Sequence, residues 1–360
     1  MSTRRSLLVL GWLVLGGLVL AAGPQVCAEP PLPGQLTALP LQTFSGSVNS
    51  TYNGRIYGDF NYVSQINTGS ESIARFAWGG TSAIQQKASG APEHRMNAPF
   101  AGASPAYVLA AGGASNSNLS RYDFSNYANR VDVAAPSGAG IVESFDWVDA
   151  NTIIADSYQS GQRNRLYLMD IVADPFGATT NTTWNANGYV TTPVTTRIRN
   201  VRAGKTFTGY AYYGDAGNNS DPKFYALNLA TGASTELGGA GTLTGSGSFG
   251  LWTVAEADGY LFVQTTDNGV QVYQMTDATT LGPLFTTYTK STIDGLFPGQ
   301  ASAQYWGFDV SPDGLHMVLS GSGGRTYQIY GVPEPSAFHL MAVGLGCLAL
   351  PFFRRRLRAA

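Results

Sequence analysis

Short apolar runs separated by polar and glycine-containing turns cover most of the chain. Four segments share one pattern, in which a tight turn joins two apolar runs, and these are residues 145–155, 198–208, 252–263 and 308–318. Their turn residues lie 53, 55 and 55 positions apart and are Asn151, Gly204, Gly259 and Gly314. Asparagine and glycine tolerate the positive φ that a tight hairpin requires. The pattern therefore predicts a repeated unit that contains a β-hairpin.

Two weaker copies extend the pattern toward the N-terminus. Ser104-Pro105 precedes an apolar run at 107–110, and Asn53-Gly54 precedes the short segment Arg55-Ile-Tyr at 55–57. A further β-patterned run follows each of the six turns, beginning at Tyr62, Leu119, Leu166, Phe224, Val270 and Thr326. Six units of about 50 residues, each with three or four short antiparallel strands, predict an all-β fold, a six-bladed β-propeller over residues 29–331. Seven blades or a two-sheet sandwich are the alternatives.

The last unit indicates how the ring closes. After Tyr330 the chain runs directly into its C-terminal segment, so this unit lacks an outer strand, whereas residues 41–48 have strand character and no unit of their own. We therefore predict that residues 41–48 complete the last blade, since blades depend on their neighbours to cover their faces and edges. The turn Ser311-Pro312-Asp313-Gly314 resembles that of TolB-like and WD40-like propeller repeats, a resemblance that implies the same fold.

Composition agrees with this fold class and excludes several functions. Charged residues make up only 12% of the chain, and 44 glycines separate the apolar runs, which is typical of all-β proteins. Of the 21 basic and 23 acidic residues, six arginines and one glutamate belong to the two end segments, which leaves the folded part with a charge of about −7. Nucleic acids and anionic lipids attract clustered basic charge, so neither is an expected partner. Both cysteines, Cys27 and Cys347, also belong to the end segments, so no disulfide is expected in the folded part.

Residues 1–28 have the three parts of a secretory signal peptide. Arg4 and Arg5 precede an apolar run from residue 7 to 22, and the small residues that follow predict cleavage after Ala28. We therefore expect the chain to pass through an export translocon, by either the general secretory or the twin-arginine route. An uncleaved membrane anchor is the alternative, although the apolar run is short for a full span.

Residues 332–360 also combine three parts in a fixed order. A proline-containing motif at 332–336 comes first and includes Val332, Pro333, Glu334 and Pro335. The 17 apolar residues that follow, 337–353, are near the lower limit for a transmembrane helix. The basic end, 354–358, is expected to stay in the cytoplasm and includes Arg354, Arg355 and Arg356. With an export signal at the other end of the chain, this order predicts a propeller that lies outside the inner membrane.

This C-terminal arrangement resembles the PEP-CTERM sorting signal, and the resemblance covers residues 332–360. It implies that an exosortase recognises Val332 to Pro335 and cleaves near this motif. It also implies that the chain is first anchored in the inner membrane and then passes to the cell surface or to an extracellular, exopolysaccharide matrix. An ordinary single-span anchor is the alternative.

Motifs for catalysis are sparse in the folded part. Its two histidines, His94 and His316, are too few for a zinc site, and it contains no Gly-x-Ser-x-Gly elbow or phosphate-binding glycine loop. Residues 215–221 are rich in oxygen ligands and form a candidate calcium loop, although ordinary turn chemistry explains the same residues; no other cofactor is predicted. Paired carboxylates carry out glycoside hydrolysis, and the third unit holds four of them, Asp146, Asp149, Asp156 and Asp170.

Three aromatic residues are candidates for contact with carbohydrate. Trp78, Trp184 and Tyr189 lie in segments rich in Gly, Asn or Thr, where they could stack on sugar rings, whereas most other aromatics are expected to fill the spaces between blades. The sequence therefore favours a non-catalytic binding or structural module, with exopolysaccharide as the candidate ligand. The alternative is a secreted polysaccharide hydrolase or lyase. Acidic groups that converge with an Arg or His in a central funnel would indicate the enzyme, and aromatics and amides over a shallow face would indicate the binding module.

Overall fold

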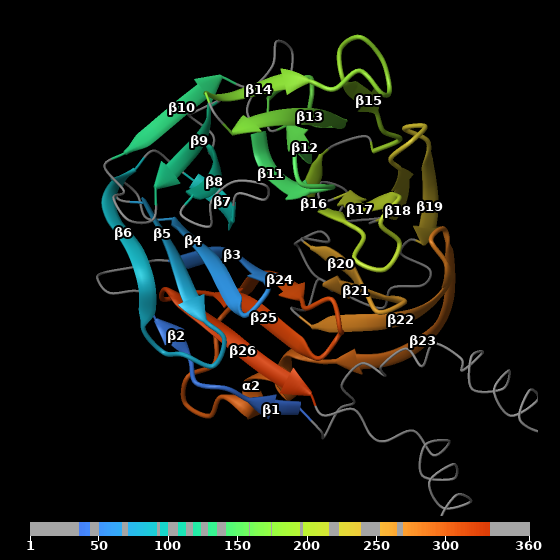
Figure 1. Ribbon diagram of the computed structural model, residues 1–360. Helices are drawn as coiled ribbons and strands as arrows, with labels where there is room; N and C mark the ends of the chain where they lie inside the picture. The colour runs from blue at the N-terminus through green and yellow to red at the C-terminus, as the bar shows by residue number, and fades with distance from the viewer. Residues whose placement is uncertain are drawn as a thin grey trace, which may run out of the picture.

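The described part of the chain forms six β-sheets in a ring around a central axis (Figure 1). In this computed structural model the described residues are 36–43, 50–66, 71–91, 94–99, 107–112, 118–123, 129–134, 142–157, 159–173, 175–194, 197–215, 223–238, 253–264 and 269–331. The prediction of an all-β, six-bladed propeller is confirmed. Among these residues, no helix is long and apolar enough to cross a membrane. The predicted signal peptide, 1–28, and the predicted sorting segment, 332–360, lie outside the described residues.

Within each blade, the strands follow one another from the axis outward. Blade 1 consists of β3 (Ser50–Tyr57), β4 (Phe60–Ile66), β5 (Glu71–Ala77) and β6 (Ala83–Ala91), and blade 2 of β7 (His94–Pro99), β8 (Tyr107–Gly112), β9 (Asn118–Asp123) and β10 (Arg130–Ala134). Blade 3 consists of β11 (Val142–Trp147), β12 (Thr152–Ser157), β13 (Arg165–Ala173), β14 (Phe176–Thr180) and β15 (Tyr189–Thr191), and blade 4 of β16 (Ile198–Ala203), β17 (Tyr210–Asp215), β18 (Phe224–Asn228) and β19 (Ser234–Gly238). Blade 5 consists of β20 (Val254–Ala257), β21 (Tyr260–Gln264), β22 (Val270–Asp277) and β23 (Thr280–Tyr288). Blade 6 consists of β24 (Tyr305–Val310), β25 (His316–Gly321) and β26 (Arg325–Gly331), together with β1 (Leu36–Ala38) and β2 (Gln42–Thr43).

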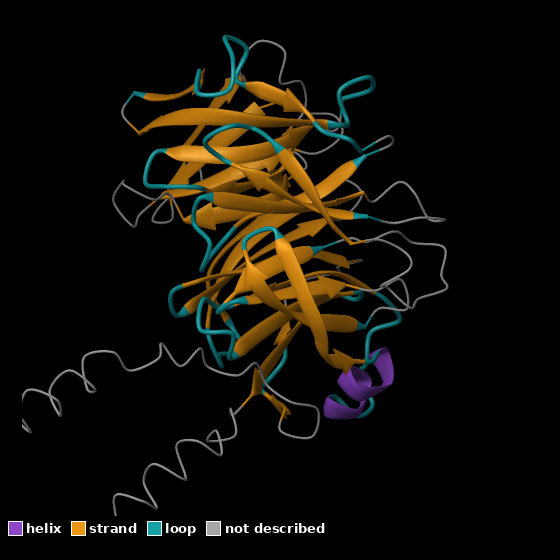
Figure 2. Ribbon diagram, turned by 90° about the vertical axis from the view of Figure 1, so that its right-hand side faces the viewer, coloured by secondary structure: helices purple, strands orange, loops and turns teal. Residues whose placement is uncertain are grey.

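The antiparallel order places the connections on two opposite faces of the ring. Turns from the first to the second strand of a blade, and from the third to the fourth, lie on one face, which we call the turn face. Connections from the second to the third strand, and from one blade to the next, lie on the other, which we call the loop face. The short helix α2 (Lys290–Leu296) joins blade 5 to blade 6 and therefore lies on the loop face (Figure 2).

The N-terminal strands close the ring, as predicted. Both β1 and β2 pair antiparallel with β26, and Leu36 lies opposite Gly331. The closing strands begin earlier than the predicted 41–48, since β1 precedes this range and β2 lies within it. Pro40 separates the two short strands because proline has no N–H to donate to a sheet. Residues 44–49 lie outside the described residues.

Two buried glutamines hold this closure together. Gln42 donates from Nε2 to the carbonyl of Ala77 at 3.1 Å and accepts from Asn61 Nδ2 at 2.6 Å. Gln328 Oε1 accepts from the Gly79 N–H at 2.9 Å. The Gln328 amide nitrogen lies within hydrogen-bond distance of two carbonyls, those of Pro40 at 2.7 Å and Gly80 at 3.3 Å. Both glutamine side chains therefore connect the closing strands and blade 6 to blade 1.

Apolar side chains pack between neighbouring sheets rather than in one central core. Ile154 and Leu168 of blade 3 share a cluster with Val201 and Tyr213 of blade 4. Similar clusters join blades 2 and 3, 4 and 5, and 5 and 6. Many of the largest fully buried side chains in these clusters are aromatic, which agrees with the expectation that aromatics fill the spaces between blades.

In the first unit, the structure differs from the predicted position of the turn by one strand. Asn53-Gly54 is not a turn, because both residues lie inside β3, and the turn to β4 is at Gly58-Asp59. A Cβ at Gly54 would lie 3.1 Å from Val318 Cγ1, and the Gly54 N–H donates to Ser320 Oγ at 2.6 Å. Glycine is present here because blades 1 and 6 approach closely, and the run at Tyr62 is consequently the second strand of its blade. Ser104-Pro105, the other weak copy, lies outside the described residues.

Gly54→Val should lower the free energy of unfolding by about 1–3 kcal/mol, because the added methyl groups would overfill the contact with Val318. The control is Gly58→Asn, at the actual turn, where φ is 56° and an added Cβ would have no atom within 4 Å. Asparagine tolerates this conformation, so the control should stay within about 0.5 kcal/mol of the wild type. Urea unfolding measures both, and equal losses at the two positions would contradict the assignment.

Candidate functional site

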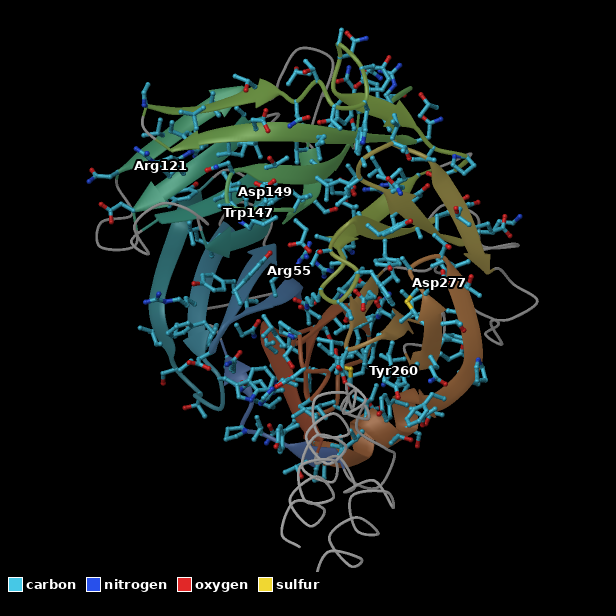
Figure 3. All side chains as sticks on the ribbon, turned by 45° about the vertical axis from the view of Figure 1, so that its right-hand side comes forward. Arg55, Arg121, Trp147, Asp149, Tyr260 and Asp277 are labelled. Atoms are coloured by element: carbon cyan, nitrogen blue, oxygen red, sulfur yellow. The ribbon has the colours of Figure 1, made fainter. Side chains whose placement is uncertain are left out.

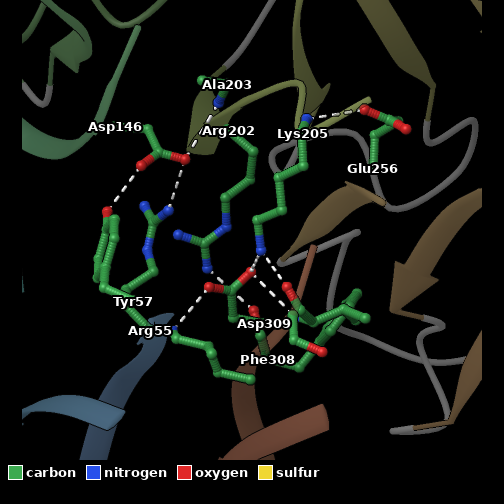
Figure 4. A network of polar contacts seen from close by, with 12 residues as sticks. Arg55, Tyr57, Asp146, Arg202, Ala203, Lys205, Glu256, Phe308 and Asp309 are labelled. Atoms are coloured by element: carbon green, nitrogen blue, oxygen red, sulfur yellow. Dashed lines mark hydrogen bonds and ion pairs between the residues drawn. The ribbon is translucent and has the colours of Figure 1, made fainter. Parts of the chain in front are cut away.

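Charged side chains from several innermost strands meet near the axis of the ring. Arg55 of β3 lies toward the centre, whereas Arg121 of β9 lies toward the outside (Figure 3). Figure 4 shows the contacts of the central group, which we call the axial cluster and which consists of Arg55, Tyr57, Asp146, Arg202, Lys205 and Asp309. These residues come from blades 1, 3, 4 and 6. Both arginines are 1% exposed and both aspartates are buried, whereas Tyr57 and Lys205 are half-buried.

Arg55 and Asp146 form the first half of the axial cluster. Arg55 Nη1 lies 3.0 Å from Asp146 Oδ2, and Arg55 Nη2 donates to the carbonyl of Phe145 at 2.9 Å. Asp146 accepts three more hydrogen bonds, from the Tyr57 hydroxyl at 2.7 Å, the Trp147 N–H at 3.0 Å and the Ala203 N–H at 3.1 Å. Burial, followed by the charge of Asp146, raises the pKa of Tyr57 well above its ordinary value, so the phenol stays protonated and donates. These contacts join blade 3 to blades 1 and 4.

The second half repeats this arrangement on the other side of the axis. Arg202 of blade 4 donates from Nη2 to the carbonyl of Phe308 in blade 6 at 2.9 Å, as Arg55 of blade 1 does to Phe145 in blade 3. The carboxylate of Asp309, next in the chain, accepts from Lys205 Nζ at 2.8 Å, the Ile56 N–H at 2.9 Å and the Val310 N–H at 2.9 Å. The axial cluster therefore has approximate two-fold symmetry. The two halves differ in the cation that pairs with the aspartate, which is Arg55 for Asp146 and Lys205 for Asp309.

Glu256 adds a further buried carboxylate beside the cluster, toward the turn face. Its Oε2 accepts from three consecutive backbone N–H groups, those of Lys205 at 2.8 Å, Thr206 at 2.9 Å and Phe207 at 3.3 Å. Successive backbone amides in a turn form a concave site that stabilises negative charge. Glu256 is thus directed at a turn of blade 4 and joins blade 5 to it.

The axial cluster contains the residue types expected of an enzyme, but its carboxylates are not accessible to a substrate. Acidic groups do converge with arginines near the axis, which is the composition predicted for a catalytic funnel. A general base must reach a substrate proton with an unoccupied lone pair. Asp146 and Asp309 are instead 6% and 2% exposed, and they accept four and three hydrogen bonds from the protein. The geometry is that of a structural network which fixes the blades to one another.

The four carboxylates of the third unit do not form a common site. Asp146 belongs to the axial cluster, whereas the exposed Asp149 accepts from the Asn151 and Thr152 N–H groups in a turn. Asp170 accepts from side chains near the outer edge of the blade, Thr152 Oγ1 at 3.1 Å and Asn181 Nδ2 at 2.7 Å. Asp156 is buried between blades. Their proximity in sequence therefore reflects the hairpins of one blade.

Asp156 lies in a second buried network, between blades 3 and 4. It accepts from the Ser144 N–H and from Ser144 Oγ, each at 2.7 Å, and Ser144 Oγ in turn accepts from the Val201 N–H at 3.2 Å. Glu143 pairs with Arg197 beside it. Burial, and next the charge of Glu143, raises the pKa of Asp156 to about 7.

We expect Asp156 to make the protein less stable as pH rises from about 5 to 7. Its folded pKa lies above the ordinary 3.8, so the folded chain binds more protons than the unfolded chain between the two values, and stability falls through this window. The slope from this one group is at most about 1.4 kcal/mol per pH unit. Urea unfolding across the window should give a flatter dependence for Asp156→Asn, with the exposed Asp149→Asn as control. If Asp156→Asn kept the wild-type dependence of the free energy of unfolding on pH, the dependence would not come from Asp156.

Trp78, one of the three predicted carbohydrate residues, lies at the boundary of two blades among aromatic and polar groups. It follows β5 on the turn face, and its ring centroid is 4.7 Å from that of His316 in blade 6. His316 also packs 4.9 Å from the Tyr330 ring, and its Nδ1 lies 3.7 Å from Asp313 Oδ1. We call Trp78, His316, Tyr330 and Asp313 the seam patch, since they lie where blades 1 and 6 meet. The three ring side chains are half-buried, and Asp313 is exposed.

Trp184 and Tyr189 lie at the outer edge of blade 3, away from Trp78. Trp184 donates from Nε1 to the carbonyl of Leu229 at 2.7 Å and packs against the core between blades 3 and 4. The ring of Tyr189 has the Arg165 guanidinium over it at 4.3 Å and the Tyr167 ring at 5.4 Å. Both rings are therefore partly covered by contacts within the protein, and the structure does not bring the three predicted residues together.

No group of three or more His, Cys, Asp or Glu side chains able to hold a metal occurs among the described residues. In the candidate calcium loop, Asp215 ends β17, and residues 216–222 lie outside the described part. His316 is the first residue of β25 and is half-buried. Burial, followed by the charges of Asp313 and Glu256, raises the pKa of Asp258 on a neighbouring turn to about 6.

Sequence reasoning found Asp146 but missed the rest of the axial cluster. One signal was present, because Phe145-Asp146 and Phe308-Asp309 occupy the same place in two repeats. Both phenylalanine carbonyls accept from an arginine, and both aspartates accept a backbone N–H from another blade. Nothing in the local pattern marks the two arginines, because their partners are 90 and 106 residues away.

No protein-family model matches the chain, and no similar curated protein is found.

Proposed function

We propose that this chain is an exported protein of the cell surface or extracellular matrix whose propeller is a non-catalytic binding module, with exopolysaccharide as its ligand class. The observation that supports a non-catalytic role is that Asp146 and Asp309 are almost fully buried and accept four and three hydrogen bonds from the protein itself. The seam patch supports contact with sugars, because it combines half-buried aromatic rings with an exposed carboxylate on one face. Aromatic faces stack on the apolar faces of sugar rings, and polar neighbours bind the hydroxyls.

A combined binding and turnover screen tests this function. The purified full-length chain is applied to a polysaccharide and glycan panel, and both retention and released products are measured. We expect retention without products, and about fivefold weaker retention for Trp78→Ala, which corresponds to roughly 1 kcal/mol of lost stacking. Tyr189→Ala, at the distant blade 3 edge, is the matched aromatic control. Product release that Asp309→Asn abolishes would instead establish the enzyme alternative.

The C-terminal segment is proposed to be an exosortase sorting signal. The last strand, β26, ends at Gly331, and the motif begins at Val332, so removal of residues 332–360 would leave every described strand in place. We expect the double variant Pro333→Ala/Pro335→Ala to remain full-length in the membrane fraction, whereas the wild type and a Ser336→Ala control lose the tail. Identical processing of all three would contradict recognition of the motif and would favour an ordinary anchor.

A further inference from the structure

Acidic side chains occupy the inner hairpin turns on the turn face of the ring. The turn from the first to the second strand contains Asp59 in blade 1, Asp149 in blade 3, Asp258 in blade 5 and Asp313 in blade 6. All of these residues are exposed except Asp258, which is half-buried. In blade 4 the same turn contains Lys205, but its Nζ is bound to Asp309 of the axial cluster. The described turns around the axis therefore give this face a negative charge.

These carboxylates lie on both sides of the aromatic rings of the seam patch. The Trp78 N–H donates to the Asp59 carbonyl at 2.9 Å, so the turn of blade 1 adjoins the Trp78 side. Asp313 belongs to the patch, and a Cβ at Gly314 beside it would lie 3.6 Å from the Cβ of Asp258. Among the described residues, no lysine or arginine forms an ion pair with any of the three aspartates. The rings of the patch thus lie among carboxylates whose charge is not neutralised by Lys or Arg.

Asp313 keeps one carboxylate oxygen available to a ligand. Its Oδ1 accepts from the Ser311 hydroxyl and from the Leu315 N–H, the latter at 3.0 Å, and lies 3.7 Å from His316 Nδ1. Its Oδ2 has no such contact among the described residues, and the side chain is 51% exposed. Burial acts to raise the pKa of Asp313, but the hydrogen bonds from Ser311 and Leu315 outweigh it and hold this pKa below the ordinary value. Asp313 is therefore ionised, and one of its oxygens faces solvent.

We propose that the seam patch binds cationic amino sugars, an inference that rests on the binding function proposed above and names its ligand class. The rings of Trp78 and Tyr330 pack on the apolar face of the sugar, and the protonated amine donates to Asp313 Oδ2. A hydrogen bond between two charged groups is about twice as strong as one between neutral groups. The same carboxylates repel uronic acids, so the charge of the patch selects cationic over anionic polysaccharides.

A matched pair of ligands tests the charge preference directly. Oligosaccharides of glucosamine and of N-acetylglucosamine with equal length differ only in the amine, and an oligosaccharide of a uronic acid supplies the opposite charge. Binding to the full-length chain is measured by calorimetry at low ionic strength, at a pH where the amines are protonated. We expect about tenfold tighter binding of the glucosamine oligomer than of the acetylated one, and no binding of the uronic acid. Added salt should reduce this preference, because it screens exposed charges.

Two variants locate the preference at the patch. Asp313→Asn retains an oxygen that accepts the hydrogen bonds of its turn, and it should lower the affinity for glucosamine to that for N-acetylglucosamine without changing the latter. Asp149→Asn removes the equivalent exposed carboxylate in blade 3, which does not border the patch, and should keep the wild-type preference. An equal loss in both variants would mean that net charge, and not the seam patch, attracts the amine, and would overturn the proposal.

The outcomes also separate this inference from the proposed function. Equal binding of the two oligomers, weakened in both cases by Trp78→Ala, would overturn the preference for amino sugars and leave the binding function in place. Tighter binding of the uronic acid would overturn the charge argument in the same way. If the wild-type chain retained no saccharide in this assay or in the polysaccharide panel, the proposed function itself would fail, and the inference with it.

Discussion

Replacing Arg55 with methionine should lower the free energy of unfolding by about 3–5 kcal/mol. The substitution leaves the carboxylate of Asp146 buried without its ion-pair partner, and it also removes the hydrogen bond to the Phe145 carbonyl. Burying an uncompensated charge is among the most destabilising changes in a folded protein. Urea unfolding followed by tryptophan fluorescence measures the loss.

A second substitution separates charge from packing at this position. Arg55→Met/Asp146→Asn removes both charges, so it should recover a large part of the loss, because the asparagine still accepts from neighbouring N–H groups. Lys223→Met is the control, since its ion pair with Glu236 is exposed and should be worth less than about 1 kcal/mol. A loss below about 1 kcal/mol in Arg55→Met would show that the axial ion pair does not hold blades 1 and 3 together.

Replacing Gln328 with alanine should cost about 2–4 kcal/mol. The buried side chain accepts from the Gly79 N–H and lies within hydrogen-bond distance of the Pro40 and Gly80 carbonyls. Alanine would leave these backbone groups without the side chain at the one place where the two ends of the ring meet, and each unsatisfied buried group costs about 1–3 kcal/mol. Urea unfolding measures the change against Gln300→Ala, whose side chain is exposed and whose loss should cost less than about 0.5 kcal/mol.

Hydrogen exchange identifies where Gln328→Ala acts. Because the closing strands and blade 1 lie on either side of this side chain, exchange should accelerate first in β1, β26 and the turn after β5. Uniform acceleration over all six blades would instead indicate that the ring opens cooperatively, and unchanged exchange at the closure would contradict the role assigned to Gln328.

The buried polar networks explain why convergence of acidic groups is a poor sign of catalysis in this ring. Radial packing brings the innermost strands together, and their charged side chains must then find partners in other blades. Asp146 does so with Arg55, Tyr57 and the Ala203 N–H. The same convergence that would assemble an active site therefore also assembles a structural clamp, and the number of hydrogen bonds each carboxylate accepts distinguishes the two.

Much of the fold was predictable from the sequence. A hairpin repeated about every 50 residues determined the number of blades, because local turn chemistry and apolar alternation are properties of short segments. The missing outer strand of the last unit likewise predicted closure by the N-terminal strand. The error at Asn53-Gly54 arose because a glycine needed for close packing of two blades has the same local signature as a glycine in a turn.

The functional interpretation depended more on tertiary structure. The sequence by itself determined the strand pattern, the low charge, and the export and sorting predictions, all of which follow from contiguous residues. Only the tertiary structure decided that Arg55 pairs with Asp146, that Trp78 packs on His316 rather than near Trp184, and that Asp258 lies beside the turn of Asp313. The physical reason is that these contacts join different blades, so their geometry depends on how the sheets pack around the ring and not on the local pattern of any one segment.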